Sequence, residues 1–130
     1  MPDKAKITDA LPLLLLVEDS QTTTVLLTKY LSGSYRLVHA KDGVQAWEIL
    51  EKNPEISLVI TDINMPRLDG IGLIKEARKL LRFTPILALT TESQQSKRDE
   101  AKKNGATGWL VKPFGGAELE KLIKQVVPGA

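Results

Sequence analysis

The sequence predicts an α/β fold in which a five-stranded parallel sheet is doubly wound, with helices on both of its faces. Three observations support this prediction. Short apolar runs of strand length recur along the chain, and helical patterns separate them throughout. The runs are apolar at almost every position, which is typical of strands covered on both faces. No internal repeat or linker interrupts the alternation, so the 130 residues fit one domain.

Composition excludes several classes of protein. The 42% hydrophobic and 26% charged residues are those of an ordinary soluble protein, and the absence of cysteine excludes disulfides and suits a reducing cytoplasm. No apolar run approaches the ~20 residues that span a bilayer. The formal net charge of +2 is too small to favour nucleic acid. We therefore expect a cytoplasmic protein, monomeric, that binds neither DNA nor membrane.

The first third of the chain predicts a tail, two strands and a helix. Residues 1–11 are expected to form a flexible N-terminal tail and residues 12–130 the folded domain. The first strand covers residues 13–17, and a weakly alternating run at 35–40 predicts an outer strand. Asp19-Ser20 supplies the start of the intervening helix, which ends at Ser32-Gly33. Its apolar face is expected to comprise Val25, Leu26, Tyr30 and Leu31.

The middle of the chain predicts a helix, the central strand and a second helix. A turn at Asp42-Gly43 precedes the helix at 44–52, which Asn53-Pro54 ends. The central strand at 57–62 follows, and Asp69-Gly70 opens the next helix. The residues expected on the buried sides of these two helices are Val44, Trp47, either Ile49 or Leu50, Ile71, Ile74, Ala77 and Leu81. Trp47 is assigned to the core.

The last third predicts two strands and two helices. The fourth strand covers residues 85–89 and the fifth covers residues 108–111. Between them lies a very polar helix at 93–103, which Asn104-Gly105 ends. The final helix covers about 117–127. Its inward residues are expected to be Leu119, Leu122, Ile123 and Val126.

Polar residues lie at the ends of four of these strands. Glu18 and Asp19 follow the first strand. Asp62 ends the third strand, Thr90 follows the fourth, and Lys112 follows the fifth. Parallel strands place their carboxyl ends at one edge of the sheet, where α/β proteins keep their binding sites. If the first strand is central, these side chains converge there.

The chemistry of this group favours a divalent cation and a phosphoryl group. Three carboxylates at one edge repel one another, so a cation is expected beside them. Mg²⁺ prefers oxygen ligands and uses one or two carboxylates together with phosphate oxygens. Lys112 would supply a second positive charge and Thr90 a hydroxyl donor to the phosphoryl oxygens. Asp62 could then act as a nucleophile and form an acyl phosphate.

These residues resemble the receiver domain of two-component response regulators, of the stand-alone chemotaxis type. The resemblance covers the chain from Leu13 to Val127, and its order and spacing are specific. Its motifs are LVEDS at 16–20, TDINMPRLDG at 61–70, LTTES at 89–93 and WLVKPF at 109–114. The resemblance implies a flavodoxin-like fold with strand order 2-1-3-4-5.

The resemblance also implies a role for each site residue. Asp62 accepts a phosphoryl group from a sensor histidine kinase. Asp19, Asp62 and the backbone carbonyl of Asn64 hold Mg²⁺, with Glu18 contributing through water. Lys112 pairs with the phosphoryl group, and a cis bond is expected before Pro113.

The same family has a switch that runs from a hydroxyl to an aromatic residue. The resemblance assigns these roles to Thr90 and Trp109, although the family more often has Tyr or Phe at the second position. A larger indole could be fixed in place, so plain packing of Trp109 stays an equal alternative. Asn64 and Glu92 occupy positions that tune autodephosphorylation. Thr91 stands where the family more often has a small Ala or Gly, and its larger side chain could narrow access to the phosphoryl group.

We expect a phosphoacceptor regulator and not an enzyme, with at most slow self-phosphorylation from small donors and autodephosphorylation. No effector domain is expected after the last helix, so the output is expected to be a change of the surface formed by 93–103, 108–111 and 117–127. The target would be a protein such as the flagellar motor switch. A phosphatase that acts on the phosphorylated protein is a further candidate partner.

Other interpretations remain open at this point. A phosphate sink or phosphorelay intermediate would use the same chemistry without an effector. An Asp-nucleophile phosphatase would need a second carboxylate two residues after Asp62, where Asn64 stands. A flavodoxin-like cofactor carrier would need a phosphate-binding loop after the first strand, which is absent. Glu18 and Asp19 could also merely cap a helix, and a lone His39 is expected to be incidental.

Overall fold

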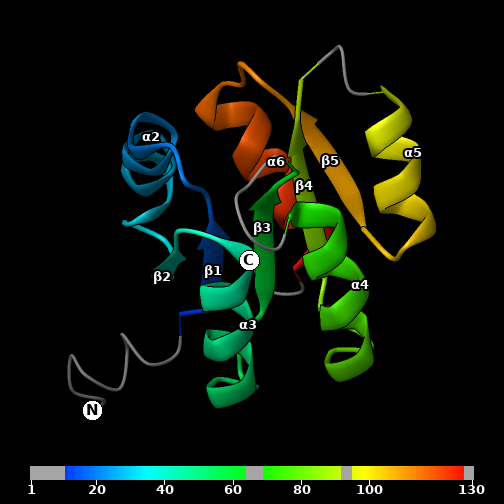
Figure 1. Ribbon diagram of the computed structural model, residues 1–130. Helices are drawn as coiled ribbons and strands as arrows, with labels where there is room; N and C mark the ends of the chain where they lie inside the picture. The colour runs from blue at the N-terminus through cyan, green and yellow to red at the C-terminus, as the bar shows by residue number, and fades with distance from the viewer. Residues whose placement is uncertain (1–10, 64–68, 92–94, 128–130) are drawn as a thin grey trace.

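A parallel sheet forms the centre of the molecule, as the apolar runs predict. The computed structural model describes residues 11–63, 69–91 and 95–127. The strands follow the order β2-β1-β3-β4-β5, and every pair of neighbours is parallel (Figure 1). The strands are β1 (Leu13–Val17), β2 (Arg36–Ala40), β3 (Leu58–Asp62), β4 (Ile86–Thr90) and β5 (Gly108–Val111). The predicted fold class and strand order are confirmed.

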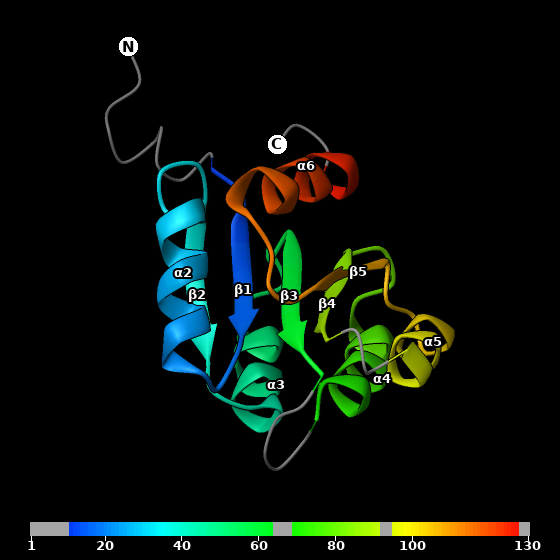
Figure 2. The ribbon, with the colours of Figure 1, turned by 90° about the horizontal axis from the view of Figure 1, so that it is seen from above.

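Helices cover both faces of this sheet. They are α2 (Gln21–Leu31), α3 (Gly43–Lys52), α4 (Gly70–Leu80), α5 (Gln95–Lys103) and α6 (Gly116–Val126). Figure 2 shows α6 on one side of the strands and α3 and α4 on the other. None of these described helices is long and apolar enough to cross a membrane.

Two apolar layers fill the space between sheet and helices. Alternate residues of β1 enter different layers: Leu15 and Val17 pack with α3, α4 and α5, whereas Leu14 and Leu16 pack with α2 and α6. All five residues of β3 and of β4 are buried. A strand buried on both faces has no solvent side, so its sequence is a continuous apolar run.

Three helices begin at a residue whose side chain caps them, and two of these caps lie at predicted helix starts. The Ser20 hydroxyl accepts a hydrogen bond from the Thr23 N–H at 3.3 Å. The carboxylates of Asp42 and Asp69 do the same for α3 and α4, at 2.9 Å and 2.8 Å. Each cap satisfies a backbone donor that the first turn of a helix leaves unpaired. The predicted starts at Asp19-Ser20 and Asp69-Gly70 are therefore confirmed.

The predicted inner face of α2 is wrong in part. Leu27 and Leu31 are buried, whereas Val25 and Tyr30 are exposed. Leu27 and Leu31 are four residues apart and lie on one side of the helix, so the buried stripe is centred about one residue away from the predicted one. Tyr30 instead lies against the start of α6, where its ring would be 2.7 Å from a Cβ added at Gly116.

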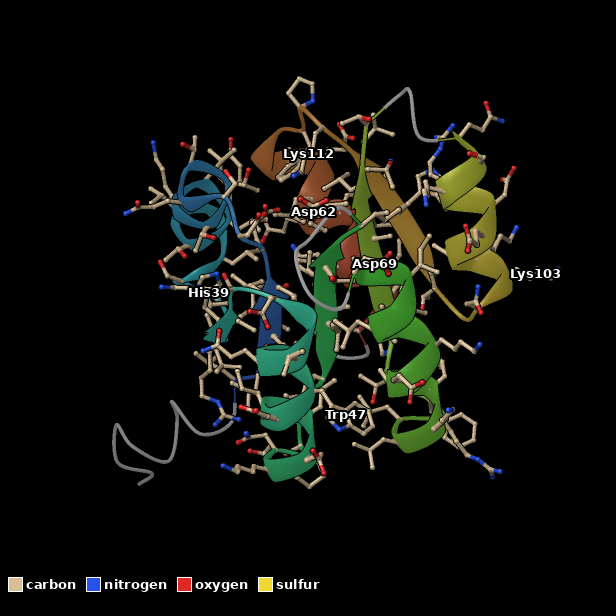
Figure 3. All side chains as sticks on the ribbon, viewed as in Figure 1. His39, Trp47, Asp62, Asp69, Lys103 and Lys112 are labelled. Carbon is tan, nitrogen blue, oxygen red and sulfur yellow. The ribbon has the colours of Figure 1, made fainter. Side chains whose placement is uncertain are left out.

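The assignment of Trp47 to the core is also wrong. Ala46 and Leu50 are the buried side chains of α3, and Val44 and Trp47 are half-buried. Trp47 lies between α3 and α4 near their lower ends (Figure 3). The small side chain of Ala46 faces the sheet, which leaves the large indole at the edge of the helix contact.

The inner faces of the later helices agree with the prediction more closely. The expected residues of α4 are all buried, and so are Leu119 and Ile123 of α6. Leu122 and Val126 are half-buried. The peptide bond between Lys112 and Pro113 is cis, as the resemblance implies.

Candidate functional site

The sheet brings the predicted polar residues to one edge. Asp62 is the last residue of β3, and Glu18 and Lys112 directly follow β1 and β5. In the register of the sheet, Asp62 lies beside Leu89 and Val17 beside Thr61. Figure 3 shows Lys112 and Asp62 close together near the top of the molecule. Three strands that are distant in the sequence therefore deliver charged groups to one site.

The Lys112 ammonium group bridges two carboxylates. Its Nζ donates to Asp62 Oδ2 at 2.9 Å and to Glu18 Oε2 at 3.2 Å. The other oxygen of Glu18 accepts a hydrogen bond from the Ser20 N–H at 3.1 Å. Glu18 and Asp62 are buried, while the Lys112 side chain is partly accessible. These charge-assisted hydrogen bonds fix the two carboxylates relative to each other.

Asp19 completes an acidic cluster with these two residues. Glu18, Asp19 and Asp62 each offer a carboxylate oxygen, and these oxygens all lie within 4.8 Å of one another. Asp19 is exposed, so the cluster opens to solvent on its side. Closely spaced, hard oxygen donors with one open side fit Mg²⁺, which keeps several waters when proteins bind it.

The charges of the cluster perturb one another. Burial, with the nearby charge of Asp62, raises the pKa of Glu18 from 4.5 to about 7, although the Ser20 N–H and Lys112 oppose this. Burial lowers the pKa of Lys112, but the hydrogen bond and charge of Asp62, helped by Glu18, outweigh burial and raise it. One ammonium group therefore does not fully compensate the buried carboxylates. A divalent cation would stabilise the ionised form of Glu18.

Thr90 brings a hydroxyl group to the same edge. It is the last residue of β4 and is completely buried. Its Oγ1 has no hydrogen-bond partner among the described residues. A buried hydroxyl without a partner costs about 1–3 kcal/mol, so it is expected to acquire one when a ligand binds. Thr91 follows at a half-buried position.

Gly70 is a positioning residue that the sequence showed only as a helix start. Its N–H donates to the Ile63 carbonyl at 3.0 Å, which holds the start of α4 against the end of β3. A Cβ at this position would meet the Asp62 carbonyl oxygen and would lie 2.7 Å from Ile63 Cα. Only glycine fits this close approach of two backbones. Sequence could not show the contact, because it joins residues that are brought together by the fold.

His39 supports the site from outside. Its Nε2 lies 2.9 Å from the Glu18 carbonyl oxygen and 3.2 Å from Thr24 Oγ1. Because Thr24 Oγ1 donates to the Ser20 carbonyl at 2.9 Å, it can accept from the imidazole, as the carbonyl does. His39 therefore ties β2 to the turn that carries the acidic residues. It is not part of the acidic cluster, but the prediction that it is incidental missed this contact.

Trp109 lies outside the cluster on β5. It pairs with Ala88, and Thr90 pairs with Val111, so Trp109 is two residues below Thr90 along the sheet. Its side chain is 38% exposed, and the Arg98 guanidinium carbon lies 5.6 Å from the centroid of its ring. The indole thus points outward, in contact with a cation. Asn64 and Glu92, the predicted tuning residues, lie outside the described residues.

Known proteins share both the sequence pattern and the fold. The family model described as the response regulator receiver domain matches residues 14–124 of this chain. Chemotaxis protein CheY1 of Helicobacter pylori is 36% identical over 118 residues, which cover 88% of this chain and 95% of that protein. A chemotaxis protein CheY homologue of Campylobacter jejuni is 34% identical over 118 residues, or 88% of this chain and 91% of the relative.

Two solved structures extend the comparison. Chemotaxis protein CheY4 of Vibrio cholerae has a TM-score of 0.85 at 37% identity and covers 91% of this chain and 100% of its own. The receiver domain of sensor histidine kinase PA1611 from Pseudomonas aeruginosa, solved with magnesium in its active-site cleft, has a TM-score of 0.82 at 30% identity, covering 90% and 98%. Since the family match runs from β1 into α6, the resemblance carried by the four motifs is confirmed, and the chain belongs to the response regulator receiver domain family.

Proposed function

We propose that this protein is a phosphorylation-dependent signalling switch in which Asp62 accepts a phosphoryl group from a histidine kinase. The observation that carries the proposal is the contact of Lys112 Nζ with Asp62 Oδ2 at 2.9 Å, inside an acidic cluster. A buried nucleophilic carboxylate beside a fixed ammonium group suits the capture of an anion. We take residues 12–130 as the receiver domain, of which the family match covers 14–124.

Phosphoryl transfer to Asp62 depends mainly on the position of its carboxylate and on the charges of the groups around it. A carboxylate oxygen of Asp62 forms a bond to phosphorus while the bond from phosphorus to the donor imidazole nitrogen breaks. The imidazole nitrogen keeps the electron pair and later takes a proton. Lys112 already lies at the carboxylate and compensates the charge of the incoming phosphoryl oxygens. Thr90 Oγ1 donates a hydrogen bond to one of these oxygens, which gives the buried hydroxyl a partner.

The donor set fits magnesium. Asp19 and Asp62 would hold the ion, the backbone carbonyl of Asn64 is a further proposed ligand, and Glu18 would contribute through water. When bound, Mg²⁺ supplies positive charge that neutralises the carboxylates and the phosphoryl oxygens. The raised pKa of Glu18 supports this assignment, because burial and the charge of Asp62 oppose ionisation of Glu18 and a nearby cation would favour it. We propose that Thr91, with Asn64 and Glu92, sets the lifetime of the acyl phosphate.

The proposed output is a change at the α5-β5-α6 surface. Movement of Thr90 toward the phosphoryl group would alter the packing below it, and Trp109 is the aromatic residue placed to respond. A shallow pocket of ≈ 300 Å³ on this surface is lined by Trp109, Leu110, Glu118, Lys121, Leu122 and Gln125. A partner bound over this pocket would contact the indole, so its affinity would depend on the position of the indole. The relatives named as chemotaxis proteins support a target in chemotaxis, such as the flagellar motor switch.

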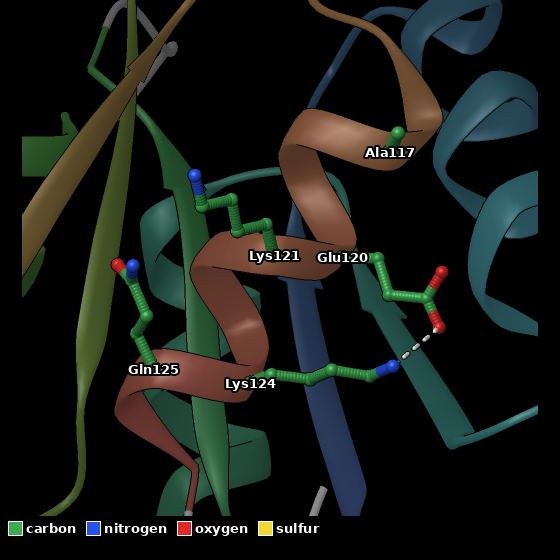
Figure 4. A pocket seen from close by; sticks show the side chains of 5 residues that line it. All are labelled: Ala117, Glu120, Lys121, Lys124 and Gln125. Atoms are coloured by element: carbon green, nitrogen blue, oxygen red, sulfur yellow. Dashed lines mark ion pairs between the residues drawn. The ribbon is translucent and has the colours of Figure 1, made fainter.

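Charged side chains of α6 border this surface. Figure 4 shows Lys121 and Gln125 on one side of the helix, and Lys124 reaching Glu120 at 3.7 Å. Together with Ala117 they line a second shallow pocket of ≈ 420 Å³. An exposed ion pair of this kind contributes about 0.5 kcal/mol or less, so a partner can break it easily. Lysine side chains of α6 are therefore available to a partner, and breaking the Lys124–Glu120 ion pair requires little free energy.

The decisive experiment is phosphorylation by a small donor. The purified protein is incubated with acetyl phosphate and Mg²⁺, and its intact mass is measured over time. We expect one phosphoryl group to be added, none to Asp62→Ala, and little to Lys112→Ala. Asp99→Ala, which removes an exposed carboxylate of α5, is the matched control and should behave as the parent. Unchanged phosphorylation of Asp62→Ala would refute the proposal.

A further inference from the structure

The turn between α4 and β4 displays an unusual pair of apolar side chains. Phe83 is 94% exposed and Leu80, the last residue of α4, is 47% exposed. Burying a side chain of this size contributes about 1.5–3 kcal/mol, so complete exposure of Phe83 forgoes that stabilisation. The turn precedes β4 and therefore lies at the edge of the sheet opposite to Asp62, which ends β3.

Hydrogen bonds from the half-buried Arg78 hold this turn. Arg78 Nη1 donates to the Leu81 carbonyl at 2.9 Å and to the Thr84 carbonyl at 2.6 Å. These two carbonyls bracket Arg82 and Phe83. Burial lowers the pKa of Arg78, and its Nη1 donates only to backbone carbonyls of this turn. Phe83 is thus presented on a fixed backbone.

The turn between α5 and β5 completes the network. Arg78 Nε donates to the Gly105 carbonyl at 2.9 Å, and Nη2 donates to Thr107 Oγ1 at 3.3 Å. Gly105 has φ +117°, and a Cβ there would lie 2.7 Å from Arg78 Cγ. A side chain at this position would therefore displace the arginine. Thr107 Oγ1 also accepts the Ile86 N–H at 3.0 Å, which ties the start of β4 to the same group.

The charged residues next to the two apolar side chains in the sequence are mostly basic. Lys75, Lys79 and Arg82 are exposed. Within residues 75–83 the one acidic residue is Glu76, and its carboxylate is paired with Lys79 at 3.2 Å. The charge of Arg78 is taken up by backbone carbonyls. Two apolar side chains flanked by cations are complementary to an apolar face that is bordered by acidic residues.

We propose that Phe83 and Leu80, with the flanking Lys79 and Arg82, form a second docking surface, here called the Phe83 surface. Its partner is an amphipathic helical segment whose apolar face is bordered by Asp and Glu. A rigid aromatic anchor loses little entropy on binding, which is typical of residues that dominate interfaces. Because the Phe83 surface lies at the edge away from Asp62, it binds irrespective of phosphorylation. This inference goes beyond the proposed switch, which uses the α5-β5-α6 surface.

A protein partner fits this surface better than a membrane does. Two apolar side chains on a compact turn offer much less area than the long apolar face of a membrane-binding helix. A turn held by hydrogen bonds also suits one complementary protein face, whereas a fluid bilayer needs no such order. Anionic vesicles therefore serve as the competing outcome of the test.

The test uses the full chain and a synthetic helical peptide with leucines along one face and glutamates beside them. Binding is followed by the amide chemical shifts of the ¹⁵N-labelled protein. We expect the largest shifts within residues 79–84, and the same affinity before and after treatment with acetyl phosphate and Mg²⁺. Phe83→Ser and Arg82→Glu should each weaken binding about tenfold or more. Val25→Ser, which removes another exposed apolar side chain, should not.

Several outcomes would overturn the proposal. One is equal binding of a peptide in which every glutamate is replaced by lysine. Another is shifts that fall outside residues 79–84 or survive Phe83→Ser, provided that its melting temperature equals that of the parent. Sedimentation of the protein with phosphatidylglycerol vesicles, lost in Phe83→Ser while the acidic peptide fails to bind, would assign the surface to a membrane instead.

Discussion

Replacing Glu18 by glutamine should stabilise the metal-free protein at alkaline pH far more than at acid pH. In the native protein, burial and the charge of Asp62 raise the pKa of Glu18 from 4.5 to about 7. Ionisation of this group therefore opposes folding. Glutamine keeps the shape and the oxygen acceptor of the neutral acid without acquiring a charge.

The size of the effect follows from the shift. A pKa raised from 4.5 to about 7 corresponds to about 3 kcal/mol, because one pKa unit is 1.36 kcal/mol. The folded protein holds the Glu18 proton more tightly than the unfolded chain does. Its contribution to stability is present below pH 4.5 and is lost as pH rises through about 7. The advantage of Glu18→Gln should thus grow by about 2–3 kcal/mol between pH 5 and pH 8.

Urea unfolding at the two pH values measures this difference. At pH 8 the midpoint of the variant should exceed that of the parent by about 1–2 M urea, given typical denaturant slopes. Glu55→Gln, which alters an exposed carboxylate, is the control and should show no such growth. Added Mg²⁺ should reduce the difference, since it favours the ionised acid. A difference that is equal at pH 5 and pH 8, or a variant that is less stable at pH 8, would refute the reasoning.

Three further substitutions test contacts at the site and at Trp109. Gly70→Ala should lower Mg²⁺ affinity and phosphoryl uptake about tenfold or more, because a Cβ meets the Asp62 carbonyl; titration and intact mass measure this. Thr90→Val should raise the stability of the metal-free protein by up to about 1 kcal/mol in urea unfolding while slowing phosphoryl uptake. Arg98→Gln should expose Trp109, which acrylamide quenching of its fluorescence detects.

Each of these substitutions has a control. Gly33→Ala tests an alanine where no atom lies within 4 Å, and it should leave Mg²⁺ affinity unchanged. Thr28→Val removes a hydroxyl from an exposed position of α2 and should not slow phosphoryl uptake. A Trp47→Phe background isolates the fluorescence of the other tryptophan. Normal Mg²⁺ affinity in Gly70→Ala, full uptake in Thr90→Val or unaltered quenching in Arg98→Gln would each contradict the role given to that residue.

The fold and the location of the site could be predicted because they depend on short stretches of sequence. Continuous apolar runs indicate buried parallel strands, and the carboxyl ends of such strands necessarily meet at one edge. Glu18, Asp62, Thr90 and Lys112 could therefore be assigned to one site from the sequence alone. Helix caps such as Asp69 are equally local, since donor and acceptor are three residues apart.

Features that depend on distant neighbours could not be predicted. The exposed Val25 and half-buried Trp47 show that helical spacing defines a stripe, while the packing of adjacent helices decides where that stripe is centred. The tie from His39 to Glu18 spans 21 residues, and that from Arg78 to Gly105 spans 27. Such contacts arise only when the fold is complete, and each residue alone has an unremarkable sequence context.

Two groups of the site carry a free-energy cost in the absence of ligands. These two costs link the structure of the site to its chemistry. Burial and the charge of Asp62 oppose ionisation of Glu18, and the Thr90 hydroxyl lacks a partner among the described residues. A cation relieves the first cost and an anionic oxygen relieves the second. Neither ligand substitutes for the other, so the two costs together favour a site filled by both. The rigid sheet prevents the side chains from avoiding these costs by moving apart, as the proposed response to phosphorylation requires.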